Sequence, residues 1–131
     1  MKLNSFKKQA GLTLIEVTLV IAVLLGLISV LFIGVGAYRE GSDRAKCILN
    51  ITNAQKAVRS YQNMYEKSAN DPITIGTIYG AGKMVETQPE CPSGGDYTFG
   101  DNIPAVGTAW LSCNFGSGET AHVPNGGTAG W

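Results

Sequence analysis

The side chains that could do chemistry are few in this chain of 131 residues: three cysteines, one histidine and ten carboxylates. The cysteines are Cys47, Cys91 and Cys113, and His122 lies in a stretch rich in Gly and Pro. A nucleophilic cysteine needs a positioned base, and the sequence places none beside any of the three. The C-x-x-C spacing typical of zinc sites is also missing. We therefore expect no enzymatic activity, no metal on these residues and a solvated His122.

Glu16 points to a different kind of site. It follows the sequence Gly-Leu-Thr-Leu-Ile from Gly11, and the stretch from Val17 to Tyr38 then carries no charged side chain. An ionisable group inside hydrocarbon costs roughly 2.5–3.5 kcal/mol on insertion scales. Because of this cost, an acidic residue at the start of such an apolar run indicates a functional role for Glu16.

The apolar run itself predicts a membrane anchor. A bilayer requires about 20 apolar residues, and the lysines Lys2, Lys7 and Lys8 before the run place the N-terminus in the cytoplasm by the positive-inside rule. A cleaved secretory signal is the alternative, with Val35-Gly36-Ala37 as its cleavage site, but its apolar stretch is normally about 7–15 residues. The length of the run favours a single-pass anchor.

The residues from Lys7 to Val17 resemble the class III signal of type IV pilins and type II secretion pseudopilins. That signal is a basic leader ending in Gly, then a hydrophobic residue, Thr-Leu-Ile-Glu and an apolar helix. The resemblance implies that a prepilin peptidase cuts after Gly11 and methylates the new amine of Leu12. Leu12 stands where many members begin with Phe, and Ile33 stands where many have Pro.

The resemblance also implies what Glu16 does. Subunits of this family pack their helices side by side with other copies or homologous subunits, using assembly machinery in the inner membrane. A neighbour could then present the cationic amine of its Leu12 to Glu16. Such a pair is stronger in low dielectric than in water, and a missing partner is correspondingly costly. We expect Glu16 to be the assembly residue; the alternative is an interfacial acid at the cytoplasmic edge of a plain anchor.

A single long helix is predicted from about Thr13 to about Ala69, with Asn70-Asp71-Pro72 as its stop. Its outer half shows an apolar stripe at helical spacing, made of Cys47, Ile51, Ala54, Val58, Tyr61 and Tyr65. We divide the chain into a leader (1–11), a transmembrane or filament-core half of the helix (12–38), an amphipathic half (39–70) and a small β- and loop-rich periplasmic region (71–131).

Two short strands are expected in the last region, at Asp96–Gly100 and Thr108–Phe115, because both stretches alternate polar and apolar residues. The segment from Thr74 to Val85 fits either a short helix or an irregular loop. The predicted fold class is α+β and pilin-like: a long N-terminal helix packed against a small antiparallel β region with a loop-rich C-terminus.

Outside the inner membrane, disulfides form and persist. Pairing Cys91 with Cys113 would close a loop of about 22 residues and contribute roughly 3 kcal/mol in the chain-entropy model. Pairing Cys47 with Cys91 would instead tie the helix to the strands. We favour the first pairing, which leaves Cys47 as a free thiol on the helix stripe.

Calcium enters only through the resemblance, because major pseudopilins of type II secretion bind Ca²⁺ in a C-terminal loop. Oxygen donors of the kind that Ca²⁺ takes are present here at Asp96, Asp101, Asn102 and Glu119. Their spacing matches no known calcium motif, so we interpret them as solvated turn residues and expect no cofactor.

The sequence thus predicts a structural subunit of a type II secretion pseudopilus or a type IV pilus. It would lie in the inner membrane, interact with lipid, and pass into a periplasmic or extracellular filament. The zero net charge and the lack of a basic patch argue against a direct nucleic-acid partner. The alternative is a monomeric, single-pass, membrane-anchored extracytoplasmic binding module.

Overall fold

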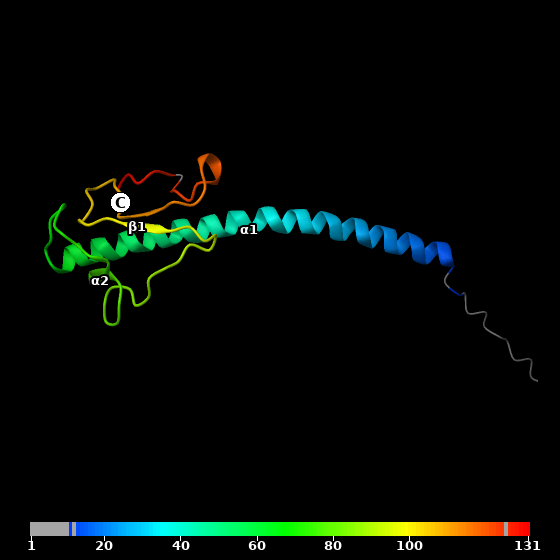
Figure 1. Ribbon diagram of the computed structural model, residues 1–131, viewed down its shortest axis with the longest axis horizontal. Helices are drawn as coiled ribbons and strands as arrows, with labels where there is room; N and C mark the ends of the chain where they lie inside the picture. The colour runs from blue at the N-terminus through cyan, green and yellow to red at the C-terminus, as the bar shows by residue number, and fades with distance from the viewer. Residues whose placement is uncertain (1–10, 12, 125) are drawn as a thin grey trace, which may run out of the picture. The chain divides into compact units, whose positions relative to one another are not determined.

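The computed structural model of the protein describes residues 11, 13–124 and 126–131 (Figure 1). The elements follow one another as α1 (Leu14–Met64), α2 (Ile75–Ile78), β1 (Tyr97–Phe99), β2 (Leu111–Cys113) and the 3₁₀ helix η1 (Gly118–Thr120). The chain divides into two compact units, with the boundary between Tyr38 and Arg39. The predicted α+β class, with a long helix packed against a small antiparallel sheet, is confirmed.

Helix α1 is continuous, as predicted, but ends at Met64, before the expected stop at Asn70-Asp71-Pro72. Glu66 adopts a left-handed conformation, with φ 50°, and the Lys67 N–H donates to the Gln62 carbonyl at 2.9 Å. This is the hydrogen bond of a Schellman cap, in which glycine normally takes the left-handed position. Because the sequence has Glu66 and no glycine at this position, it gave no signal that the helix ends at Met64.

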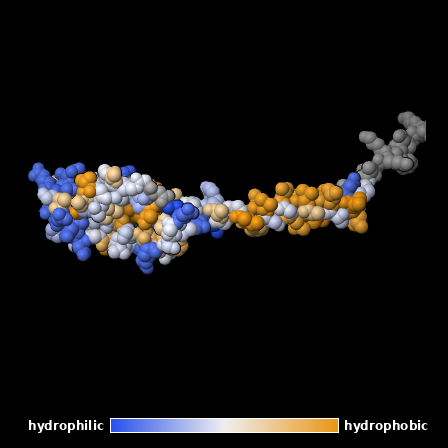
Figure 2. Space-filling model, turned by 90° about the horizontal axis from the view of Figure 1, so that it is seen from above, coloured by the Kyte–Doolittle hydropathy of each residue, from blue (hydrophilic) through white to orange (hydrophobic). Residues whose placement is uncertain are grey.

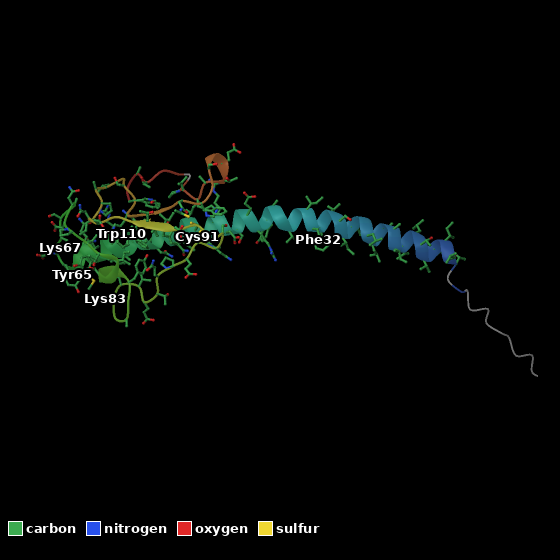
Figure 3. All side chains as sticks on the ribbon, in the orientation of Figure 1. Phe32, Tyr65, Lys67, Lys83, Cys91 and Trp110 are labelled. Atoms are coloured by element: carbon green, nitrogen blue, oxygen red, sulfur yellow. The ribbon has the colours of Figure 1, made fainter. Side chains whose placement is uncertain are left out.

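The first unit contains the apolar half of α1. Its large side chains are exposed along the whole stretch from Leu14 to Tyr38; Phe32, labelled in Figure 3, is 76% exposed. Figure 2 shows the resulting surface as a nearly continuous apolar band. At about 1.5 Å per residue, this stretch exceeds the hydrocarbon thickness of about 30 Å. It is long and apolar enough to cross a membrane.

The second unit has its core on the amphipathic half of α1. The predicted stripe is buried at Cys47, Ile51, Ala54 and Val58, whereas Tyr65, at its end, is exposed. Ala57, also on α1, belongs to this core, and the remaining core residues come from the segments that cover this face of the helix: Ile73, Ile78, Tyr79, Cys91, Ile103, Trp110 and Leu111. The stripe therefore correctly predicted which face of the helix is covered.

Strands β1 and β2 form a two-stranded antiparallel sheet and lie within the two predicted segments. Tyr97 pairs with Cys113, and Phe99 pairs with Leu111. Leu111 is buried and Cys113 half-buried, while Ser112 between them is exposed. The alternation of the sequence thus matches one covered and one solvent-facing side of the sheet.

The sheet is joined to α1 through Gln55, which is buried although polar. Its side-chain carbonyl accepts a hydrogen bond from the Trp110 N–H at 2.9 Å, and its amide donates to the Thr108 carbonyl at 3.1 Å. The Trp110 indole N–H donates in turn to the Gly100 carbonyl at 2.7 Å. These bonds fix the position of β2 along the helix.

Arg59 holds a second set of contacts on the same helix. Its guanidinium donates to the backbone oxygens of Pro104 at 2.8 Å and Trp131 at 2.9 Å. It also donates to the Ala105 carbonyl at 3.2 Å and to the Gln62 side chain at 2.8 Å. The loop between the strands and the last described residue are thereby held against α1.

Candidate functional site

The helix terminus at Glu16 is the first of the two sites that we describe. The Thr13 N–H donates to the Glu16 carboxylate Oε2 at 2.9 Å, and the Glu16 N–H donates to the Thr13 hydroxyl at 3.3 Å. This reciprocal pair is a capping box, whose sequence form is Ser/Thr-x-x-Glu. The sequence Thr-Leu-Ile-Glu carried that signal, and our sequence reasoning missed it. Glu16 therefore has a local structural role, which is to satisfy an N–H at the start of α1.

The neighbouring residues of the expected cleavage site are only partly described. Gly11 is exposed, and a Cβ added to it would meet no atom within 4 Å. Leu12, the expected methylated terminus, lies outside the described residues. Cleavage after Gly11 therefore stays a prediction.

The second site was not expected. The ligand atoms of all three cysteines and of His122 lie within 4.8 Å of one another. We call these four side chains the thiol–imidazole cluster. Figure 3 labels Cys91 in this part of the second unit.

No two sulfurs of this cluster lie at disulfide-bonding distance in the structure, and all three cysteines, each in the described part of the chain, are free. The expected disulfide between Cys91 and Cys113 is therefore corrected, and the alternative pair, Cys47 with Cys91, is also unbonded. From the sequence, we paired Cys91 with Cys113 and treated Cys47 as a separate free thiol. The fold instead brings a third thiol from α1 and an imidazole to the same place.

Each member of the cluster comes from a different segment. Cys47 is on α1, and Cys113 is the last residue of β2. Cys91 precedes a turn at Gly94, which has φ 80° and donates its N–H to the Cys91 carbonyl at 3.0 Å. His122 follows η1. The cluster is thus assembled entirely by tertiary structure.

His122 is only 1% exposed, so the expectation of a solvated histidine was wrong. The chain reverses after Phe115, whose carbonyl accepts the His122 N–H at 3.1 Å. The two rings lie 4.7 Å apart. Nδ1 of His122 is 3.4 Å from the Cys91 sulfur, whereas Nε2 is buried and has no hydrogen-bond partner among the described residues.

The thiols of the cluster differ in acidity. Burial raises the pKa of Cys47 to about 12, although the Tyr97 hydroxyl donates to its sulfur at 3.3 Å. Burial also acts to raise the pKa of Cys91, but the backbone N–H groups of Ser93 and Gly95, with the two other thiols, outweigh it and lower that pKa. N–H groups aimed at a sulfur favour its thiolate form.

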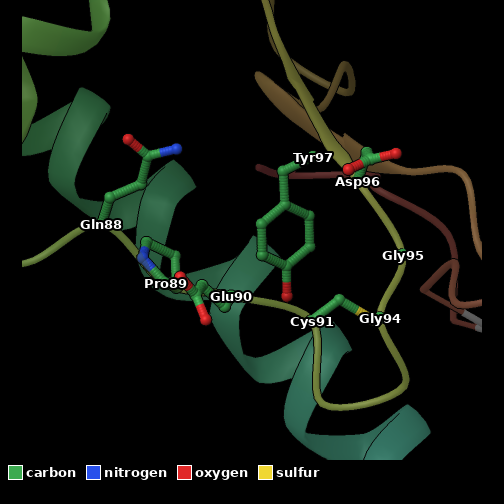
Figure 4. A pocket seen from close by; sticks show the side chains of 8 residues that line it. All are labelled: Gln88, Pro89, Glu90, Cys91, Gly94, Gly95, Asp96 and Tyr97. Atoms are coloured by element: carbon green, nitrogen blue, oxygen red, sulfur yellow. The ribbon is translucent and has the colours of Figure 1, made fainter.

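A cavity of about 330 Å³ opens beside Cys91 (Figure 4). Its walls are the segment before Cys91, the turn after it and the ring of Tyr97. In Figure 4 the Cys91 side chain points toward the Gly94–Gly95 segment. The cavity therefore reaches one member of the cluster from the surface.

The oxygen donors considered for calcium are arranged differently. All four are exposed: Asp96, Asp101, Asn102 and Glu119. None of them belongs to the group of potential metal ligands that converges within the described residues. Their interpretation as turn residues on the surface stays a prediction.

The sequence could not have located the thiol–imidazole cluster by spacing. We expected no metal because the sequence lacks the C-x-x-C spacing. That reason no longer holds, because the fold brings four residues that are distant in sequence close together. Comparisons of the chain with protein families, curated proteins and solved structures gave no match. The function is therefore inferred from the motifs and the geometry of the chain itself.

Proposed function

We propose that this protein is a pilin-like filament subunit, cut after Gly11 and assembled through the apolar half of α1. The observation that carries the proposal is the position of Glu16. It is an acid in the first turn of a helix whose next turns carry no charged side chain and expose mainly apolar ones. The family resemblance of the surrounding residues supplies the processing step.

The exposed apolar side chains support this proposal physically. A surface of this extent is not stable in water and needs lipid or other apolar helices to cover it. A plain anchor meets that need with lipid alone. In a filament subunit, contacts with neighbouring helices replace the contacts with lipid. This requires an interaction that fixes how the helices align.

Glu16 is suited to set this alignment because the capping box uses only one hydrogen bond to its carboxylate, from the Thr13 N–H to Oε2. A carboxylate accepts several hydrogen bonds through two oxygens. The amine of a neighbouring Leu12 could therefore bind Glu16 without breaking the cap. Charge-assisted bonds of this kind are roughly twice as strong as neutral ones.

The test separates the cap from the charge. Glu16→Gln keeps an oxygen that accepts the Thr13 N–H and removes the negative charge. Thr13→Val removes the hydroxyl acceptor and keeps the charge. Full-length chains with a photo-crosslinking residue at Leu25 would be expressed with a prepilin peptidase, and the N-terminus read by intact mass.

We expect wild type and Thr13→Val to start at Leu12, to carry one methyl group and to give ladders of crosslinked copies. Glu16→Gln should be inserted and cut but give no ladder. A ladder from Glu16→Gln equal to wild type would refute the assembly role. A wild-type chain that keeps Met1 and crosslinks to no other copy would favour the monomeric anchored module.

A further inference from the structure

The thiol–imidazole cluster has the composition of a structural zinc site. Zn²⁺ sites with three cysteines and one histidine are tetrahedral, with Zn–S near 2.3 Å and Zn–N near 2.0–2.1 Å. Those bond lengths place neighbouring sulfurs about 3.8 Å apart. The four ligand atoms here lie within 4.8 Å of one another, so the widest pair would close by about 1 Å on binding.

The number of thiols also favours a metal over a disulfide. A disulfide between two of the three cysteines leaves the third thiol and the buried His122 without a function. The nitrogen of His122 that faces the thiols is Nδ1, which lies 3.4 Å from the Cys91 sulfur, and a neutral imidazole nitrogen is a common zinc ligand. A tetrahedral ion uses all four side chains at once.

We propose that the thiol–imidazole cluster is a structural Zn²⁺ site that holds the second unit together. Binding would form three Zn–S bonds and one Zn–N bond and release the three thiol protons to solvent. The metal would crosslink α1, the turn before β1, β2 and the segment after η1. Small domains commonly need such a staple because their cores are limited.

Groups around the cluster fit the charge that the bound ion would leave. One Zn²⁺ with three thiolates carries a net charge of about −1. The Tyr97 hydroxyl donates to the Cys47 sulfur, and the backbone N–H groups of Ser93 and Gly95 are directed at the Cys91 sulfur. Hydrogen bonds of this outer kind orient the ligands of metal sites and stabilise their charge.

The ion would also have a route to the site. The cavity of about 330 Å³ that is lined by Cys91, Gly94, Gly95 and Tyr97 opens to the surface. A route of entry is one of the requirements for a metal site. The position is distant in sequence from Glu16, so this inference does not depend on the filament proposal.

The first experiment uses the full-length wild-type chain, extracted in mild detergent from membranes; one sample is denatured at harvest with a thiol-alkylating reagent and a chelator, so that buried and metal-bound thiols also react. Intact mass counts the thiols that were not oxidised, and elemental analysis of an unalkylated sample gives the zinc content. We expect about one Zn²⁺ per chain and three reduced cysteines. Replacement by Co²⁺ should give the absorption bands of tetrahedral thiolate coordination.

Variants then locate the ion. Cys47→Ser and His122→Asn should weaken Zn²⁺ binding on the order of tenfold or more and lower the midpoint of thermal unfolding. His122→Cys should retain the ion, because it supplies a fourth thiolate. Ile51→Val, a conservative change in the core one turn away, is the matched control and should retain Zn²⁺ with its Co²⁺ spectrum unchanged.

The outcomes separate clearly. A wild-type chain with one reduced cysteine and no zinc would show that a disulfide occupies the site and would overturn the proposal. Three reduced cysteines without zinc would also overturn it, as would zinc retained at full affinity in both Cys47→Ser and His122→Asn. These wild-type measurements stand even if a variant does not fold.

Discussion

The hydroxyl of Tyr97, on β1, donates a hydrogen bond to the sulfur of Cys47, on α1, at 3.3 Å. The same phenolic oxygen accepts a hydrogen bond from the Asn50 side chain at 3.1 Å. Burial and the hydrogen bond to Cys47 raise the pKa of Tyr97 above its usual range, although the hydrogen bond from Asn50 acts to lower it. The phenol is therefore a neutral donor that links the sheet to the helix beside the thiol–imidazole cluster.

Removing this donor should weaken the second unit modestly. In the presence of a chelator, Tyr97→Phe should lower the free energy of unfolding by about 1 kcal/mol, because one partly buried hydrogen bond is lost while the ring remains. Chemical denaturation followed by tryptophan fluorescence would measure it. A value equal to wild type would mean that water replaces the hydroxyl.

Gln55 should matter more, because its side chain serves two backbone groups of the β2 segment. Gln55→Leu would leave the Trp110 N–H and the Thr108 carbonyl without their partner, at about 1–3 kcal/mol each. Lys56→Leu, at the exposed neighbouring position, should change the stability by less than about 0.5 kcal/mol. Denaturant titrations of both variants would test this, and equal values would contradict it.

Gly95 is required by the close approach of β2 and the following chain. A Cβ at this position would lie 2.5 Å from the Cβ of Phe115 and 3.0 Å from the Cys113 sulfur. Gly95→Ala should therefore cost about 1–3 kcal/mol, as overpacking in a core does, and it should disturb the cluster. Gly76→Ala, where a Cβ meets open space, is the control and should be nearly neutral.

Arg59 should control the mobility of the strand connection. Arg59→Lys keeps the charge but cannot reproduce a planar fork of five donors, so the contacts to Pro104, Ala105 and Trp131 cannot all remain. Amide hydrogen exchange should become faster in the loop from Asp101 to Thr108 and unchanged at the α1 core. Equal exchange in wild type and Arg59→Lys would show that the loop holds itself in place.

The capping box should stabilise the first turn of α1 in the membrane-bound chain. Thr13→Val removes the hydroxyl that accepts the Glu16 N–H, at about 0.5–2 kcal/mol. Thr13→Ser keeps that acceptor and is the control. Hydrogen exchange of the first-turn amides in detergent micelles should be faster in Thr13→Val only, and no difference would mean that the surrounding polar groups cap the helix.

Local patterns predicted much of this fold. The apolar stripe gave the buried face of α1, since helical spacing alone decides which side chains share a face. Alternation gave the two strands and their antiparallel pairing. Errors began where the local signal is weak: Glu66 ends the helix in a conformation that normally signals itself by glycine.

The thiol–imidazole cluster could not be predicted for a different reason. Its four members are brought together by the packing of β2 and the C-terminal segment on α1, and no local pattern encodes that packing. His122 seemed solvated because the C-terminal stretch around it is rich in Gly and Pro, yet the turn after Phe115 buries it. Gln55 was missed likewise, because its partners are backbone groups whose position depends on tertiary structure.

Cys47 is the first buried residue along α1. A pulling force applied to the apolar end of the helix would therefore reach the buried core of the second unit first at this side chain. Hydrogen bonds near the point of attachment would share that force, and a metal–sulfur bond at Cys47 would make the attachment covalent in character. The mechanical strength of the protein would then depend on the occupancy of a single ion.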